Sequence, residues 1–209
     1  NRDLLRLSHV KTTDTARNAI FKWVTNKDEA IVPQLHPQIL AMHELLKNKD
    51  AINLRSAVDK IITYKLPWEA IPSEFLNYKE VWEALLPEMG LTAIVRNLAK
   101  MTSIGFLEPD NLVSKQISDI LANEDLIKKS RVHPITFLAA LTTYHRGRGA
   151  RGHLTWQPVK SVCDALDVAF YKSFRNVEPT NKPTMIAIDV SGSMGTGEIA
   201  GIPGLVPRT

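Results

Sequence analysis

Asp189, Ser191 and Ser193 stand on alternate positions directly after a short apolar run at residues 184–188, and their side chains all end in oxygen. A carboxylate and two hydroxyls in one tight loop suit a hard divalent cation, and Mg²⁺ is expected because it takes octahedral oxygen ligands and keeps several waters. The alternative is structural, with Asp189 or Ser191 capping a following helix. Two other loop chemistries fail: a phosphate-binding loop ends in Lys and none follows Lys182, and a nucleophile elbow needs glycine where Ser191 stands.

A basic segment lies further upstream. Between Leu126 and Cys163 the sequence has no Asp or Glu, although the whole chain carries a net charge of only +4. The segment holds seven cations, so the rest of the chain sums to −3; they are Lys128, Lys129, Arg131, Arg146, Arg148, Arg151 and Lys160. Basic charge gathered in one segment favours a polyanionic partner such as nucleic acid.

The centre of this segment is a loop in which three arginines alternate with glycines. Arg146, Arg148 and Arg151 are placed to contact phosphates, and the flanking Tyr144 and Trp156 could stack on exposed bases. We expect Lys128, Lys129 and Arg131 to add a general positive field. The alternative is a solvated surface loop whose arginines bind nothing specific.

Composition excludes several classes of protein. With 209 residues and 44% hydrophobic residues, the chain is too apolar for a disordered protein and long enough for one full core and part of a second. It has no unbroken apolar stretch long enough to span a membrane and no signal-peptide pattern at its start. The single cysteine, Cys163, suits a reducing compartment, so a cytoplasmic location is expected. The first residue is Asn1, and we expect the chain to be part of a longer protein.

The elements that must position these residues are mostly helices. Cap residues, prolines and apolar residues at three- and four-residue spacing predict helices over residues 11–25, 37–46, 50–65, 78–86, 91–101, 110–122, 134–144 and 158–174. Helices of this length with short loops suggest antiparallel pairs of the HEAT or armadillo kind. The continuous apolar run at 184–188 predicts a strand of a parallel sheet, buried on both faces, after a linker at 178–183.

Six segments, in order along the chain, resemble the Ro autoantigen family, the TROVE-domain RNA-binding proteins. They are residues 3–9, 79–86, 91–102, 131–134, 147–152 and 189–194, and the glycine-rich tail that follows is typical of a bacterial-type member. The resemblance implies that residues 1–177 are the C-terminal part of a HEAT-like helical ring. It also implies that residues 184–209 begin a truncated α/β von Willebrand A domain, whose metal-ion-dependent adhesion site would include Asp189, Ser191 and Ser193.

The same resemblance implies a function. Its members bind Y or Y-like noncoding RNAs and the single-stranded ends of misfolded RNAs, and a Y-like RNA tethers bacterial members to the exoribonuclease polynucleotide phosphorylase. His9 matches the family histidine implicated in Y RNA binding. The expected protein is therefore a non-catalytic RNA binder of RNA quality control, acting in a ribonucleoprotein.

Two hypotheses from other classes stay open. One is a helical protein–protein scaffold whose metal site grips an acidic residue of a partner. The other is a metal-dependent hydrolase, which the sequence supports least, because no second carboxylate and no general base accompany Asp189.

Overall fold

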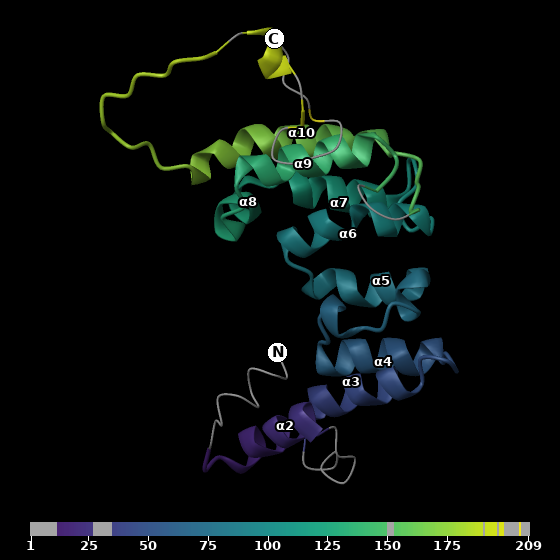
Figure 1. Cartoon of the computed structure of the whole chain (residues 1–209). Helices are drawn as coiled ribbons and strands as arrows, with labels where there is room; N and C mark the ends of the chain where they lie inside the picture. Colours follow the sequence, from purple (N-terminus) through teal and green to yellow (C-terminus); the bar gives the residue numbers. More distant parts are fainter. Residues whose placement is uncertain are drawn as a thin grey trace. The chain divides into compact units, whose positions relative to one another are not determined.

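The structure is a computed structural model that describes residues 12–26, 35–149, 153–189, 191–195, 197, 198 and 205. The chain divides into two compact units, Asn1–Glu88 and Met89–Thr209. In the described part of the chain, helices make up all the regular structure except one isolated β-bridge (Figure 1). The prediction of a mainly helical protein is therefore confirmed.

The N-terminal unit contains four α-helices in its described residues. They are α2 (Thr15–Asn26), α3 (Pro37–Lys47), α4 (Leu54–Tyr64) and α5 (Lys79–Leu85), with single 3₁₀ turns at Trp68–Ala70, Phe75–Asn77 and Leu86–Glu88. Helix α4 packs between α3 and α5. Its buried side chains Ala57 and Ile61 lie one turn apart on one face, as the apolar spacing predicts.

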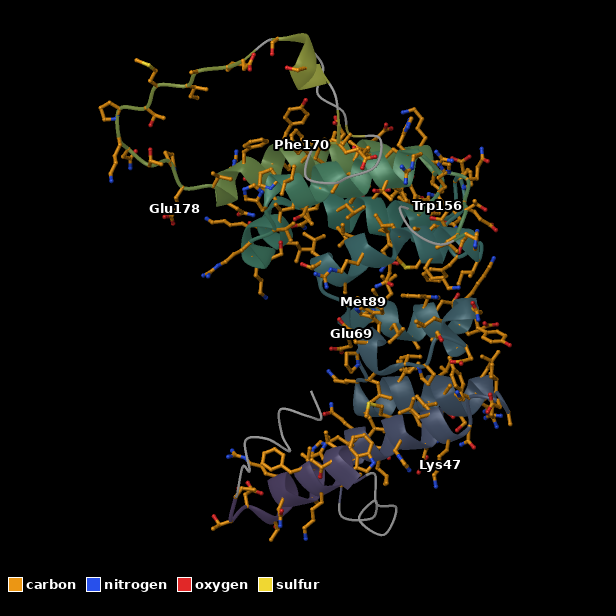
Figure 2. The ribbon with its side chains drawn as sticks, in the orientation of Figure 1. Lys47, Glu69, Met89, Trp156, Phe170 and Glu178 are labelled. Carbon is orange, nitrogen blue, oxygen red and sulfur yellow. The ribbon has the colours of Figure 1, made fainter. Side chains whose placement is uncertain are left out.

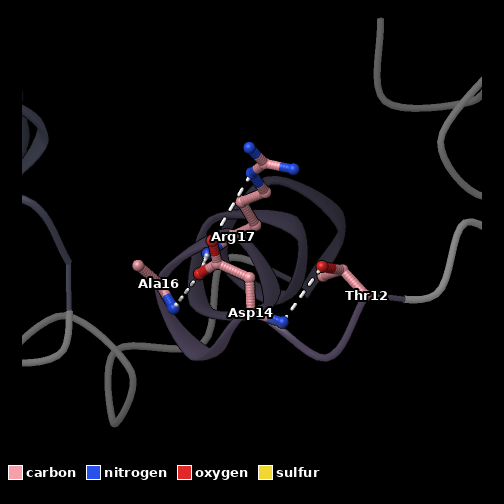
Figure 3. Close-up of polar contacts among 4 residues, drawn as sticks. All are labelled: Thr12, Asp14, Ala16 and Arg17. Atoms are coloured by element: carbon pink, nitrogen blue, oxygen red, sulfur yellow. Dashed lines mark hydrogen bonds and ion pairs between the residues drawn. The ribbon is translucent and has the colours of Figure 1, made fainter.

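Helix α2 begins at a cap that the sequence predicts. The Asp14 Oδ1 atom accepts hydrogen bonds from the backbone N–H groups of Ala16 (2.9 Å) and Arg17 (3.1 Å), and Thr12 Oγ1 accepts from Asp14 N (3.1 Å) (Figure 3). These bonds satisfy donors that the first helical turn leaves unpaired. The helix therefore starts after Asp14 rather than at residue 11.

The C-terminal unit is built around its last helix. It contains α6 (Leu91–Ser103), α7 (Leu112–Ala122), α8 (Glu124–Ser130), α9 (Pro134–His145) and α10 (Lys160–Ser173), followed by 3₁₀ turns at Phe174–Asn176 and Gly192–Gly195. Helix α10 packs against α7, α8 and α9, and α6 packs against α7, α8 and α9. The core formed by these helices includes the buried side chains Leu98, Ile117, Leu121, Phe137, Val162 and Leu166.

Side-chain caps fix the first residue of several helices. Asn53 and Asn111 cap α4 and α7 by accepting from the backbone N–H groups of Ser56 (3.0 Å) and Ser114 (2.6 Å). These two helices therefore begin directly after their caps rather than at residues 50 and 110. At α9 the Nδ1 atom of His133 accepts from Ile135 N (3.2 Å), with proline in the first helical position, and the predicted start of a helix at residue 134 is confirmed.

Helix α8 is not among the predicted helices, although its sequence carries the signals of a helix. Asn123 Oδ1 accepts from Leu126 N (3.0 Å), two acids occupy the first turn, and Lys128 and Lys129 occupy the last. This order of cap, acids and bases matches the helix dipole. Its two apolar residues, Leu126 and Ile127, are adjacent, so the segment lacks the three- and four-residue apolar spacing on which the other predictions depend.

The strand expected at 184–188 has no pairing partner among the described residues. Its apolar side chains face solvent, with Met185 at 96% exposure. A strand of a parallel sheet is stable only when hydrogen-bonded neighbours and covering helices bury it. The strand, the linker at 178–183 and the domain that they would begin therefore stay predictions.

Candidate nucleic-acid interface

The two ends of the arginine-glycine loop pair with each other and form a short antiparallel hairpin. Gly149 N donates to the Leu154 carbonyl (3.0 Å), Trp156 N donates to the Gly147 carbonyl (3.0 Å), and Arg148 pairs with Thr155 in the isolated bridge. Residues 150–152 lie outside the described residues, and the predicted contact residue Arg151 is one of them. The hairpin holds Arg148 at a fixed, exposed position directly after α9.

Gly147 is required by the geometry of this hairpin. Its φ of +70° lies in the left-handed region, and a Cβ added there would stand 2.8 Å from the backbone oxygen of Trp156. Both features disfavour any side chain. Gly147 is therefore needed for the shape of the hairpin.

Arg146 differs from the other described arginine of the loop in that its guanidinium turns back on the chain. Its Nη2 donates to the carbonyls of Arg148 (3.3 Å) and Gly149 (3.2 Å), while Nε is buried without a hydrogen-bond partner among the described atoms. The side chain thus braces the hairpin from inside. Its predicted contact with phosphate stays a prediction.

The expectation that Tyr144 and Trp156 offer exposed stacking surfaces is wrong. Their exposed fractions are 2% and 9%, and the two rings stack on each other with centroids 6.1 Å apart. Trp156 Nε1 donates to the Tyr144 carbonyl (2.8 Å), and the Tyr144 hydroxyl bonds Thr102 Oγ1 (2.8 Å) and accepts from Val159 N (3.3 Å). Burial raises the pKa of Tyr144. The pair anchors the hairpin to α6 and α10 because each ring buries its apolar body and still finds partners for its polar atoms.

The second group of predicted residues lies at the end of α8. Lys128, Lys129 and Arg131 are exposed, and Arg131 ends the helix with a left-handed φ of +53°. Asn176, which follows α10, holds this end of α8. Its Nδ2 atom donates to the carbonyls of Ile127 (3.1 Å) and Val132 (3.1 Å). Sequence reasoning missed Asn176, because its partners lie more than forty residues away in the chain.

The two basic groups lie at opposite ends of α9. Arg131 precedes Pro134 at its start and Arg146 follows His145 at its end, and a twelve-residue helix is about 18 Å long. Figure 1 shows α8 at one end of the α9–α10 pair, and Figure 2 labels Trp156 at the other. The acid-free segment is continuous in sequence but forms two separate basic clusters.

The seven cations of the segment differ in what they contact. Lys160 forms an ion pair at 2.5 Å with Asp164, an acid that lies just beyond the acid-free segment. The Arg146 guanidinium donates to backbone carbonyls of its own loop. Of the cations of the acid-free segment that the structure describes, four are exposed and form no ion pair with another described residue: Lys128, Lys129, Arg131 and Arg148. These four are the side chains best placed to meet a polyanion. His9, the predicted Y RNA contact, lies outside the described residues.

The predicted metal ligands converge in one turn. Ser191 N donates to Asp189 Oδ1 (2.8 Å), the hydroxyl oxygens of Ser191 and Ser193 are 3.0 Å apart, and hydrogen bonds from Ser191 lower the pKa of Asp189. Neighbouring oxygens of an octahedral Mg²⁺ site are also about 3.0 Å apart, at a metal–oxygen distance of about 2.1 Å. Within the described ranges, no three His, Cys, Asp or Glu side chains gather into a metal-binding group, so one carboxylate and two hydroxyls are the donors at this turn.

A groove between α6 and α9 has no counterpart among the sequence predictions. It has a volume of about 260 Å³ and is lined on one side by Val95, Arg96, Leu98 and Ala99 and on the other by Thr136, Ala139, Ala140, Thr143, Tyr144 and Trp156. No local sequence signal marks it, because it arises only when two helices about forty residues apart pack together.

Among the described helices, none has the length and apolar character needed to cross a membrane.

Comparison with known proteins shows which class of protein this chain resembles. Residues 61–143 match the TROVE domain, and the chain is similar along nearly its whole length to an RNA-binding Ro protein. The chain is 38% identical over 208 residues to the RNA-binding protein RO60 of Deinococcus radiodurans, covering 99% of this chain and 38% of that protein. It is 39% identical over 181 residues to the RNA-binding protein RO60 of Caenorhabditis elegans, covering 84% of this chain and 27% of that protein.

A solved structure agrees with these relatives. The crystal structure of the Deinococcus radiodurans RO (RSR) protein matches with a TM-score of 0.79 and 36% identity, over 98% of this chain and 41% of that chain. The resemblance to a bacterial-type Ro protein is thereby confirmed. The chain spans about two fifths of the length of that protein.

Proposed function

We propose that this chain binds RNA through the two basic clusters at the ends of α9. The observation that carries the proposal is that four cations of the acid-free segment, Lys128, Lys129, Arg131 and Arg148, are exposed and form no ion pair with another described residue. Exposed side chains of this kind bind phosphates by releasing counterions. Homology to proteins named for RNA binding supports RNA as the polyanion.

The finer proposal rests on the family resemblance. The RNA would be a Y or Y-like noncoding RNA, or the single-stranded end of a misfolded RNA, with His9 on the Y RNA surface and Arg146 and Arg151 adding phosphate contacts. The helices would belong to a HEAT-like ring in a cytoplasmic ribonucleoprotein of RNA quality control, with an exoribonuclease such as polynucleotide phosphorylase as partner. The chain itself would perform no catalysis.

The salt dependence of binding tests the proposal. The logarithm of the affinity for a single-stranded RNA should fall linearly with the logarithm of salt concentration. Lys128→Gln with Lys129→Gln should reduce that slope by about 0.7 for each phosphate that the variant no longer neutralises. Lys160→Gln is the matched control, because Lys160 is already paired with Asp164 and should leave the slope unchanged. Affinity that is independent of salt would refute the proposal.

We also propose a divalent cation, Mg²⁺ by preference, at Asp189, Ser191 and Ser193. The 3.0 Å between the hydroxyl oxygens of Ser191 and Ser193 supports this cation, because neighbouring ligands of Mg²⁺ have about this separation. A bound cation would supply an open coordination position for an acidic group, which is the property that the alternative scaffold function needs. Calorimetric titration of Mg²⁺ into the chain should give heat of binding that Asp189→Ala abolishes; no heat with either protein would leave a purely structural turn.

A further inference from the structure

We propose that the groove between α6 and α9 receives one unpaired nucleotide of a single-stranded RNA, with its base in the groove and the adjoining phosphates on Arg96 and Arg148. This inference deepens the proposed RNA binding and rests on it. It assigns a binding place to an RNA base, whereas the basic clusters contact only phosphates.

The charge around the groove suits a polyanion. Arg96 is exposed on its rim, and among the described residues no carboxylate lies within ion-pair distance of Arg96 and no acid lines the groove. The two clefts along α4 in the N-terminal unit differ in this respect, because Glu44 lines both of them and Asp59 lines one. Arg guanidinium groups also stack on flat bases as well as pairing with phosphates.

The groove leads directly to the hairpin that carries Arg148. Trp156 lines the groove, and its backbone N–H is hydrogen-bonded to the Gly147 carbonyl at 3.0 Å. Arg148 is the next residue after Gly147 in that hairpin and is exposed. A strand whose base enters the groove would therefore meet Arg96 in the groove lining and Arg148 in the hairpin beside Trp156.

The walls of the groove favour a flat, partly polar ring. The small side chains of Ala139 and Ala140 leave room on the α9 side, and the half-buried Thr136 and Thr143 add hydroxyl groups to a lining whose charged residue is Arg96. A volume of about 260 Å³ is below the range of about 300–1,000 Å³ typical of sites for drug-sized ligands. A single base is thus a better occupant than a larger ligand.

Two variants of the chain test the groove. Ala140→Leu fills it and should weaken binding of a fluorescein-labelled oligouridylate about tenfold, the change expected for one stacked base. Arg96→Gln removes its cation and should weaken the same binding and lower its salt slope by about 0.7, the change expected for one phosphate contact. Binding of a fully paired RNA duplex should stay within about twofold, because paired bases are not free to enter. Lys115→Gln, an exposed charge on α7 outside the groove, is the control and should change neither affinity.

Photo-crosslinking of the unaltered chain gives an independent readout if Ala140→Leu lowers the melting temperature. A thiouridine-substituted strand should crosslink to residues 95–99, 136–144 or 156. Crosslinks confined to other segments, or unchanged oligouridylate affinity in both variants while Arg148→Ala weakens it, would overturn the groove and leave the proposed RNA binding intact. Absence of RNA binding by the unaltered chain would instead overturn the proposed function.

Discussion

At the scale of single residues, the basic loop depends on side chains that hold it rather than on its charges. Arg146 bonds two carbonyls of its own hairpin, and Tyr144 and Trp156 are buried beneath it. These residues, whose types suggest contact with RNA, therefore stabilise the hairpin. Stability measurements should separate these residues from Arg148, which is exposed and free of ion pairs with other described residues.

Gly147→Ala should destabilise the chain by about 2 kcal/mol or more, because the new Cβ meets the Trp156 backbone oxygen at 2.8 Å and a left-handed φ strains any L side chain. Urea unfolding measures the decrease. Gly192→Ala is the control, since a Cβ there meets nothing within 4 Å. Equal midpoints for the two variants would contradict the assigned role of Gly147.

Tyr144→Phe should cost about 1–3 kcal/mol at neutral pH, because Val159 N no longer has its acceptor in a buried site. It should also change the response to alkali. Burial raises the pKa of the folded-state phenol, so above about pH 10 the unfolded chain releases this proton first and folding stability falls. Unfolding measured from neutral pH to above pH 10 should show a smaller fall for the variant.

The Cys163 thiol also lowers folding stability as the pH rises, since burial raises the pKa of this thiol too. The difference between the unaltered chain and Tyr144→Phe isolates the phenol, because both proteins keep the thiol. If the stabilities of the two proteins fall in parallel above pH 10, the hydroxyl of Tyr144 is not the group responsible.

At the scale of elements, α8 is a short helix held in place by its neighbours. Asn176 binds two carbonyls at its C-terminal end, and Lys172 Nζ donates to the Ala122 carbonyl at the end of α7 (2.7 Å). Seven residues are too few for a helix that is stable alone in water. The position of Lys128 and Lys129 is therefore set by α10 and the turn that follows it.

Asn176→Ala should destabilise the chain by about 1–3 kcal/mol, because the Val132 carbonyl loses this donor and the Ile127 carbonyl keeps only the Ser130 hydroxyl as a side-chain donor. It should also weaken hydrogen-exchange protection in α8 before other helices. Arg175→Ala is the matched control, because its exposed ion pair with Glu124 contributes at most about 1 kcal/mol. Unchanged exchange in α8 would mean that this helix does not depend on the Asn176 side chain.

At the scale of the whole molecule, a net charge of +4 conceals a segment with seven cations, and folding divides that segment again. One cluster follows α8, the other follows α9, and Lys160 is paired with Asp164. Because the clusters are separated by the length of α9, they should act on a long RNA as independent sites.

Independent sites predict additive salt effects. For a single strand long enough to reach both ends of α9, Lys128→Gln with Lys129→Gln and Arg148→Ala should each lower the salt slope, and the triple variant should lower it by the sum, about 2. Fluorescence anisotropy over a range of salt concentrations measures each slope. A triple variant whose slope equals that of Arg148→Ala would show that RNA binds at one end of α9 only.

Much of the helical structure is predictable from the sequence, because its determinants lie within a few residues of one another. The caps Asp14 and His133 bond backbone groups two or three residues away, and the predicted helices follow these caps. Even α8 carries its own local signals. The convergence of Asp189, Ser191 and Ser193 is equally local, since one turn brings their oxygens together.

The sequence by itself therefore determined the helices, the acid-free segment and the family resemblance, all of which depend on near neighbours or on residue order. Only the tertiary structure decided that Tyr144 and Trp156 are buried, that α9 separates the cations into two clusters, and that α6 and α9 enclose a groove beside Arg96. These features depend on contacts between segments far apart in the chain. The burial of these two rings and the shape of the groove follow from packing between distant segments, which the local spacing of residues does not encode.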